Sequence, residues 1–555
     1  MKRFLPLMLL LLLLLPAVAL AGVRVAGSVK TAAGAVPVLA HVHLLRQNSM
    51  KPVESVEVGR DGRYTISVPA SGAWSLQFTA VDHDGYTVPL VIGDGMADIS
   101  LDVALPQLAF NRKPDTVWIM GDWNSFDFGS ATPMKRGKDG RFTFDAPANG
   151  GEVRYQLIGI ATTDGEGMRS VNAPNSAGYV YDGGGDYRSI MAVKKAKKGK
   201  VTITFDPAML PAEQTTAARA TFGPENRVQE RMAELAAMAK QDYRTLRMAM
   251  MKAHQEGKEM PIPTSLSLQS MEVLPMEMRK NGDGTLRQFA AVVLTQFLQG
   301  AKDSALAAEI LAMTPVTSAI WGVIPYSAAR TASAVDGKGA PVTATRFIET
   351  NPDREVQATV LSSLVSDAFH ANRETELRTL YGRLKENYSD MESMGYALTE
   401  YNPDAAIRVG KMVPDFEVTL LTGEKVSRES MMGKTYMIDF WATWCGPCVA
   451  EMPSLHAAWE KYKGKNGFTV LSLSFDGKEG DIAPFREKKW KMPWMHTFVE
   501  GGFKNDLSKR FEVMGIPKPL LVGPDGTIIA TESDLRGRDL DATLAKHLGG
   551  EQAMN

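Results

Sequence analysis

The chain has 555 residues, of which 44% are hydrophobic and 23% are charged, a composition that is ordinary for a globular protein of several domains. The formal net charge is −1, so no global field attracts nucleic acid or an anionic membrane, and we expect no nucleic-acid partner. The chain contains only 2 cysteines, which excludes a framework of several structural disulfides.

The first residues have the pattern of an export signal. A basic pair precedes the apolar run of residues 4–15, and Pro16 ends this run. The small-x-small sequence at residues 19–21 predicts a cleavage site, so we expect residues 1–21 to be a signal peptide and Gly22 to begin the mature chain. We therefore predict an exported, periplasmic protein. The alternative is a membrane anchor, if this uncharged run is not cleaved.

Two β-rich regions follow, residues 22–105 and 106–206, and for each we predict a β-sandwich built from short alternating strands. A similar sequence motif occurs in both regions. The sequence GRDGRYTISVPASG begins at Gly59, and GKDGRFTFDAPANG begins at Gly137. Asp-Gly suits a turn with positive φ, and Pro-Ala ends the strand that follows, so we predict a hairpin shared by both regions.

The first region resembles the carboxypeptidase-regulatory-like family, from Gly27 to the Asp-Gly turn. The second resembles the early-set, glycogen-binding type of carbohydrate module, in VWIMGDWNSFDF, DGRFTFDAP and VRYQLIGI. This resemblance implies an aromatic residue that stacks on sugar, and Phe126 stands there instead of the usual tryptophan. Gln156, after Tyr155, stands where a binding lysine often lies. We favour a structural role over glycan binding.

Residues 207–405 change to a helical period, and we predict an all-α domain without a catalytic signature. Met248, Met250, Met251 and His254 lie close together in one predicted helix. Thioether groups of exported proteins can bind copper(I), but methionine at helical spacing more often fills a core or forms an adaptable contact surface. We therefore expect no metal site.

Residues 406–550 alternate between strands and helices, which predicts an α/β domain. This region holds both cysteines, Cys445 and Cys448. A structural zinc site would need four ligands, and covalent haem attachment would need histidine at the position of Val449. A peroxiredoxin motif would need proline at Ile438 and threonine at Ala442. Dithiol–disulfide exchange remains, with no metal or organic cofactor.

The expected local structure gives each cysteine a role. Cys445 follows an apolar strand and begins a helix, whose free N–H groups stabilise the reactive thiolate. We therefore expect Cys445 to be the more exposed thiol and the nucleophile. Cys448, one turn into the helix, would attack the resulting mixed disulfide as the resolving thiol. Pro447 suits the first turn, where its missing N–H is not needed.

The sequence MIDFWATWCGPCVAEMP resembles the thioredoxin superfamily and its exported TlpA/ResA-type branch. The preceding GKMVPDFEVTLLTGEKVS resembles the β-hairpin extension of that branch, and GFTVLSLSFD, FEVMGIP and LLVGPDGTIIA follow in the expected order. The resemblance implies that Asp439 is a buried acid that accepts the proton of Cys448. By strand alignment, Ser472 replaces the lysine that often faces this acid, which implies less compensation of its charge and a proton path that relies on water.

The same resemblance implies further shaping residues. Pro517 matches the family's cis-proline, and the backbone of Ile516 would pair with an incoming peptide. Pro453 matches a proline that kinks the active-site helix. The remaining expectations concern the surroundings of the thiols: Trp444 partly exposed for docking, Trp441 packed, and Glu451 either tuning the thiols or lying on a solvated helix face.

Gly446 and Pro447 between the cysteines resemble reducing members of the superfamily. We therefore predict an exported thiol–disulfide oxidoreductase that takes electrons from a membrane-embedded donor and reduces protein disulfides. Two alternatives stay open. The chain could be a cell-envelope binding or scaffold protein that uses its β-rich regions, or a thiol peroxidase.

Overall fold

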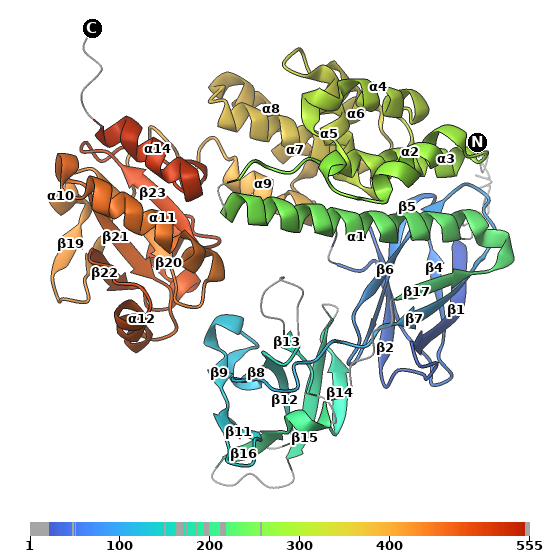
Figure 1. Cartoon of the computed structure of the whole chain (residues 1–555), viewed down its shortest axis with the longest axis horizontal. Coiled ribbons are helices and arrows are strands. Elements are labelled where there is room, and N and C mark those ends of the chain that lie inside the picture. Colours follow the sequence, from blue (N-terminus) through green and yellow to red (C-terminus); the bar gives the residue numbers. More distant parts are fainter. Residues whose placement is uncertain are drawn as a thin grey trace, which may run out of the picture. The chain divides into compact units, whose positions relative to one another are not determined.

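The computed structural model describes residues 22–46, 49, 51–148, 151–161, 170–173, 176–183, 186–193, 199–210, 218–255 and 258–549 (Figure 1). Contacts divide the chain into two compact units. One unit contains the residues up to 110 together with 179–187 and 211–398, and the other contains 111–178, 188–210 and the residues from 399 on. The predicted signal peptide, residues 1–21, lies outside the described residues. Across the described ranges, no helix is both long and apolar enough to cross a membrane.

The first β-rich region forms two sheets of four strands each, with the orders β17-β7-β1-β4 and β3-β2-β5-β6. The strands are β1 Val23–Thr31, β2 Ala40–Leu45, β3 Glu54–Glu57, β4 Arg63–Val68, β5 Gly72–Ala80, β6 Tyr86–Ile92, β7 Ile99–Leu105 and β17 Arg219–Phe222. Their alternating residues supply one core, in which Val25 and Ile66 of the first sheet join Val42, Trp74 and Leu90 of the second. The first sheet therefore buries one face, as the alternation along β4 and β7 predicts, whereas all of β2 and most of β5 in the second sheet are buried. The assignment to a sandwich class stays a prediction.

The second β-rich region also has two sheets. One has the order β10-β11-β16, and the other has the order β14-β15-β12-β8-β9, with β13 beside β12. The strands are β8 Trp118–Gly121, β9 Thr132–Pro133, β10 Lys135–Arg136, β11 Phe142–Pro147, β12 Gly151–Ile158, β13 Ser170–Val171, β14 Gly178–Tyr181, β15 Tyr187–Val193 and β16 Lys200–Phe205.

The repeated turn is confirmed, but the shared hairpin is not. The N–H of the first glycine bonds to the carbonyl of the arginine four residues on, at 2.8 Å from Gly59 and 2.7 Å from Gly137. After the second turn, β11 pairs with the preceding strand β10. At the first turn, β3 pairs with β2 while β4 pairs with β1, so the predicted hairpin is wrong there. The turn geometry is local, whereas burial of apolar side chains selects each strand's partner.

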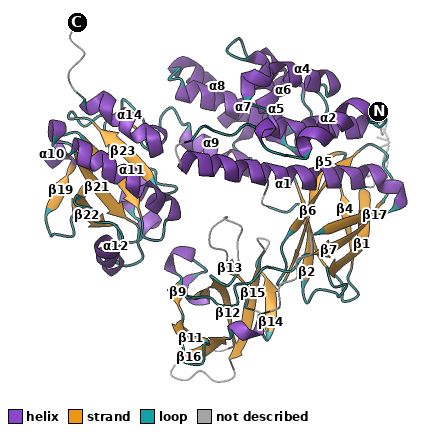
Figure 2. Ribbon diagram, viewed as in Figure 1, coloured by secondary structure: helices purple, strands orange, loops and turns teal. Residues whose placement is uncertain are grey.

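The middle of the chain is helical, as predicted (Figure 2). The helices are α1 Arg227–Gln255, α2 Ser270–Lys280, α3 Gly284–Leu294, α4 Ser304–Met313, α5 Pro325–Asp336, α6 Val342–Thr350, α7 Arg354–His370, α8 Glu374–Tyr388 and α9 Gly395–Glu400. The predicted helical range also contains strand β17, which pairs antiparallel with β7. Four residues are too short for a helical period to reveal, and pairing with an edge strand decides their structure.

The C-terminal region is an α/β domain whose five-stranded sheet has the order β22-β21-β20-β23-β24. Its strands are β20 Tyr436–Trp441, β21 Thr469–Ser474, β22 Met495–Phe498, β23 Lys518–Val522 and β24 Ile528–Ala530. The helices are α10 Arg428–Met431, α11 Gly446–Tyr462, α12 Ile482–Lys488, α13 Asp506–Arg510 and α14 Gly537–Leu548. The expected hairpin extension is present, with β18 Glu417–Thr419 antiparallel to β19 Lys425–Ser427.

The central strand β20 positions the site. It runs parallel to β21 and antiparallel to β23, and all six of its residues are buried. Helix α11 begins shortly after the carboxyl end of β20 and contacts α14 (Figure 1). In open α/β sheets, the ends of the parallel strands are where functional groups gather. The two cysteines lie at this place.

Candidate active site

Cys445 and Cys448 form a disulfide at the start of α11, with an S–S distance of 2.00 Å. Cys445 is the N-cap residue of the helix, and its Sγ accepts a hydrogen bond from the backbone N–H of Cys448 at 3.1 Å. Pro447 lies in the first turn, as predicted. A helix N-terminus of this kind favours a negative charge on the capping sulfur once the disulfide is reduced.

Both sulfur-bearing residues are buried in this oxidised state. Cys445 is 4% exposed and Cys448 is 2% exposed, so the expected contrast in accessibility is small here. Sγ of Cys445 lies 3.7 Å from the carbonyl oxygen of Ile516, and the peptide bond between Ile516 and Pro517 is cis, as the resemblance implied. The loop before this proline therefore lies against the first cysteine.

The surface next to the disulfide is partly apolar. Trp444 is 42% exposed while Trp441 is fully buried, which confirms the predicted exposure of the first ring and packing of the second. Met514, in the loop before the cis-proline, is 79% exposed and was not predicted. Trp444 directly precedes Cys445 in the chain, and an exposed apolar side chain at this place is a candidate contact for a substrate.

Asp439 is a buried acid on β20, with 5% of its surface exposed. Ser472 on β21 lies opposite Asp439 in the register, which confirms the strand alignment, and its hydroxyl donates to Oδ2 of Asp439 at 3.2 Å. Burial raises the pKa of Asp439 to about 6, while the hydrogen bond from Ser472 lowers it and the negative charge of Glu451 raises it. Half of the aspartate population is therefore ready to accept a proton near pH 6.

Glu451 and Pro453 both lie within α11. Oε2 of Glu451 accepts a hydrogen bond from the backbone N–H of Gly537 at 2.7 Å, and Oε1 lies 3.4 Å from Nε of Arg536. These contacts connect Glu451 to the start of α14. The glutamate is thus not on a freely solvated helix face, although its charge also acts on Asp439.

Asp476 is a further residue at the site that was not predicted. Its carboxylate accepts hydrogen bonds from the N–H of Thr443 at 3.1 Å, from Oγ1 of Thr443 at 2.6 Å and from Oγ of Ser474 at 2.6 Å. Asp476 therefore holds the segment that joins β20 to α11. Asp476 could have been predicted as a site residue from its position just after the apolar parallel strand β21, because the carboxyl ends of parallel strands meet at one edge of the sheet.

A metal centre has little support in the part of the chain that the structure describes. Within it, no group of three or more His, Cys, Asp or Glu side chains could hold a metal ion. Met248 and Met251 of α1 are exposed, and the side chain of His254 lies outside the described residues.

The predicted sugar-binding positions are occupied in other ways. The guanidinium of Arg188 lies over the ring of Phe126, 3.9 Å from its centroid, so it covers one face of the ring that would stack on sugar. Gln156 is only 4% exposed. Oδ1 of Asn124 accepts a hydrogen bond from the N–H of Gly121 at 2.9 Å, which holds the turn. This geometry does not favour glycan binding.

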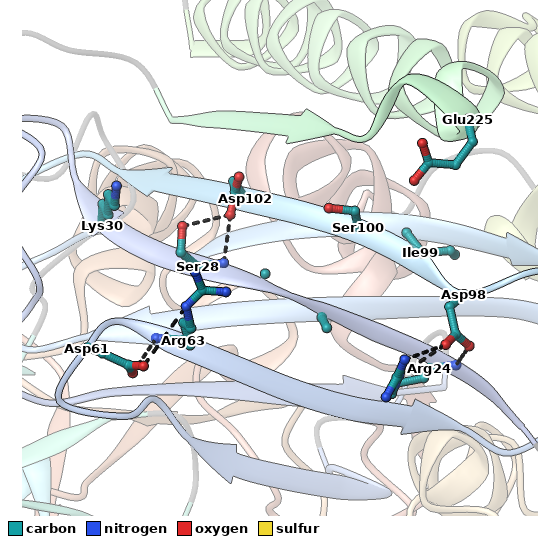
Figure 3. Close-up of a pocket in the computed structure, with 12 residues that line it drawn as sticks. Arg24, Ser28, Lys30, Asp61, Arg63, Asp98, Ile99, Ser100, Asp102 and Glu225 are labelled. Carbon is teal, nitrogen blue, oxygen red and sulfur yellow. Dashed lines mark hydrogen bonds and ion pairs between the residues drawn. The ribbon is translucent and has the colours of Figure 1, made fainter.

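A second surface lies on the sheet of β1, β4 and β7 in the first β-rich region (Figure 3). Arg24 pairs with Asp98 at 2.9 Å, with side chains that are 62% and 54% exposed. The hydroxyl of Ser28 donates to Asp102 at 2.7 Å. Exposed ion pairs of this kind contribute about 0–1 kcal/mol. Because these polar groups pair with one another, the surface gives no argument for a specific ligand.

Comparison with known proteins places similarity at the C-terminal domain. Residues 433–528 match the thioredoxin-like domain family. Over 159 residues, the chain is 30% identical to the thiol-disulfide oxidoreductase ResA of Bacillus cereus, which covers 28% of this chain and 87% of the relative. Over 125 residues, it is 37% identical to the thioredoxin-like protein YneN of Bacillus subtilis, and the match covers 22% of this chain and 71% of the relative. The solved thioredoxin domain of a thiol-disulfide oxidoreductase from Bacteroides vulgatus is 32% identical. This match covers 26% of this chain and 99% of the solved chain, at a TM-score of 0.24.

Proposed function

Since the chain belongs, through its C-terminal domain, to the thioredoxin-like thiol–disulfide oxidoreductases, we propose that it reduces protein disulfides through Cys445 and Cys448. The observation that carries this proposal is the position of Cys445 as the N-cap of α11, with the N–H of Cys448 aimed at its sulfur. This hydrogen bond from the N–H of Cys448 to Sγ of Cys445 would stabilise a thiolate after reduction.

The reaction begins from the reduced dithiol. The thiolate of Cys445 attacks one sulfur of the substrate disulfide, the substrate S–S bond breaks, and its other sulfur leaves as a thiolate. A mixed disulfide then joins Cys445 to the substrate. Trp444 and Met514 would contact the substrate beside the thiol, and the backbone of Ile516 would hold the peptide as a short added strand.

The second step releases the product. The thiol of Cys448 gives its proton to the carboxylate of Asp439, and the resulting thiolate attacks Sγ of Cys445. The mixed disulfide breaks, the Cys445–Cys448 bond forms, and the substrate leaves as a second thiolate. Two electrons have then passed from the dithiol to the substrate. Burial of Asp439 supports this role, because a carboxylate with a pKa of about 6 is a stronger base than an exposed one.

Two features of the sequence support a reducing direction and a periplasmic place for the reaction. The Gly446-Pro447 pair is typical of reducing members of the superfamily, and the export pattern of residues 1–21 would deliver the protein to the periplasm. A membrane-embedded donor would return electrons to the disulfide. Gly446 and Pro447 would also shape the site by beginning α11. No metal or organic cofactor takes part in this scheme.

The proposal is tested by trapping substrates on the full-length protein. In Cys448→Ser, attack by Cys445 should still occur but resolution should not, so mixed disulfides accumulate and are released by dithiothreitol. Cys445→Ser is the matched control and should trap little, because the N-cap position that activates the thiol then holds a serine hydroxyl. Equal trapping by the two variants would overturn the assignment of Cys445 as the nucleophile.

A further inference from the structure

Trp490 and Trp494 form an aromatic cluster with His456 of α11, and two consecutive hydrogen bonds connect this cluster to the buried acid Asp439. The indole Nε1 of Trp494 donates to Oγ of Ser472 at 2.9 Å, and Oγ of Ser472 donates to Oδ2 of Asp439 at 3.2 Å. The three residues are 7%, 0% and 5% exposed, respectively. Water therefore competes little for either bond.

The chemistry of these groups fixes which atom donates in each of the two hydrogen bonds. An indole nitrogen can only donate, whereas a serine hydroxyl has one hydrogen to donate and lone pairs that accept. While Trp494 donates to the serine oxygen, the hydroxyl hydrogen is directed to another acceptor, and the carboxylate of Asp439 provides it. A buried hydroxyl without such a constraint can rotate to other acceptors.

We propose that Trp494 is a positioning residue for the dithiol reaction: its N–H fixes the Ser472 hydroxyl as the donor to Asp439 and thereby sets how readily this carboxylate accepts the proton of Cys448. The inference rests on the proposed function. In this proposal, the uncharged side chains of Trp494 and Ser472 control the proton affinity of Asp439. The resemblance implied instead that Asp439 lacks a facing lysine and exchanges its proton through water.

The other groups around Asp439 do not supply the same stabilisation. Helix α11 contributes the dithiol and Glu451, whose negative charge disfavours the carboxylate. Strand β22 contributes His496, opposite Ser472; burial lowers the pKa of this histidine to about 3, so it stays neutral. Strand β23 places Pro519 opposite Asp439, whereas Lys518 of the same strand lies opposite Phe440. Among these groups, the hydrogen bond from Ser472 is the one that lowers the pKa of Asp439.

The test follows the two thiol steps separately in the full-length reduced protein. Ellman's reagent releases one thionitrobenzoate when Cys445 attacks it and a second when Cys448 resolves the mixed disulfide. The rate of the second release, measured against pH, reports the proton transfer to Asp439. The apparent midpoint belongs to the coupled pair of Cys448 and Asp439.

Removing the relay should raise this midpoint. We expect Ser472→Ala to raise it by about one pH unit, which slows resolution about tenfold below the midpoint, because a hydrogen bond to a charged group is worth roughly that much. Trp494→Phe keeps an aromatic ring and should raise the midpoint by about half a unit. The matched control is Trp490→Phe, because Trp490 packs on His456 in the same cluster but does not donate to Ser472.

A double variant separates the relay from simple packing. In the Ser472→Ala background, Trp494→Phe should cause no further shift of the midpoint, since its N–H no longer has the serine to orient. An equal shift in both backgrounds, or an unchanged midpoint in Trp494→Phe, would overturn the proposal. If Trp494→Phe does not fold, an unchanged midpoint in Ser472→Ala overturns it instead. A wild-type protein that releases no thionitrobenzoate would contradict the proposed function itself.

Discussion

The acid behind the dithiol has opposite effects on stability and on reactivity. Asp439 lies almost out of contact with water, and burial raises its pKa from 3.8 to about 6. The folded chain therefore binds this proton more tightly than the unfolded chain does. Stability falls as the pH rises from about 4 to about 6 and stays lower above that range. At 1.36 kcal/mol per unit, the carboxylate destabilises the oxidised fold by about 3 kcal/mol at neutral pH.

Asp439→Asn should consequently stabilise the oxidised protein at pH 8 by about 3 kcal/mol and change it little at pH 4. Hydrogen exchange of the β20 amides, compared between variant and wild type at each pH, measures this difference. Asp481→Asn, at an exposed position, is the control and should change neither value. A variant that is no more stable than wild type at pH 8 would contradict the assigned burial cost.

At the residue scale, prediction succeeded where the signal was local. Cys445, Pro447 and Asp439 have fixed spacings around one strand and one helix, so the sequence located them relative to one another. Trp494 and Asp476 could not be found in this way. Their roles depend on which strands pair and on the register between them, and these are decided by burial across segments far apart in the chain.

At the element scale, the turn between β20 and α11 carries the reactive sulfur, and Asp476 holds this turn. Asp476→Ala should destabilise the C-terminal domain by about 3 kcal/mol, because the partly buried donors of Thr443 and the buried hydroxyl of Ser474 lose their acceptor. It should also slow the attack by Cys445, which the first release of thionitrobenzoate measures. Asp481→Ala is the exposed control. An unchanged first phase would show that the turn does not need this carboxylate.

Elements with a long, regular period were predicted well. The helical period of residues 207–405 predicted an all-α region, and helices α1 to α9 lie within this range. Strand pairing was harder, as the repeated Asp-Gly turn illustrates. Its local geometry is the same at Gly59 and Gly137, yet only the second turn joins paired strands. A turn restricts a few dihedral angles, whereas the partner of a strand depends on the whole core.

At the scale of the whole molecule, the reactive domain contains its own core. The buried residues packed together around the disulfide run from Val413 to Leu548, so the chemistry needs no side chain from the rest of the protein to fill that core. The chain has no other cysteine with which the dithiol could pair. We propose that the long part of the chain before this domain positions or targets it. The exposed ion pair of Arg24 with Asp98 and the ring of Phe126 covered by Arg188 do not indicate what this part binds.

The most direct test of the central claim is reduction of insulin by the full-length protein with dithiothreitol as the electron source. The wild type should accelerate insulin precipitation well above the rate with dithiothreitol alone, because the thiolate at the start of α11 attacks the insulin disulfides. Cys445→Ala should reduce the rate to that background. Equal rates for the wild type and Cys445→Ala would contradict the assignment of this site as a disulfide reductase.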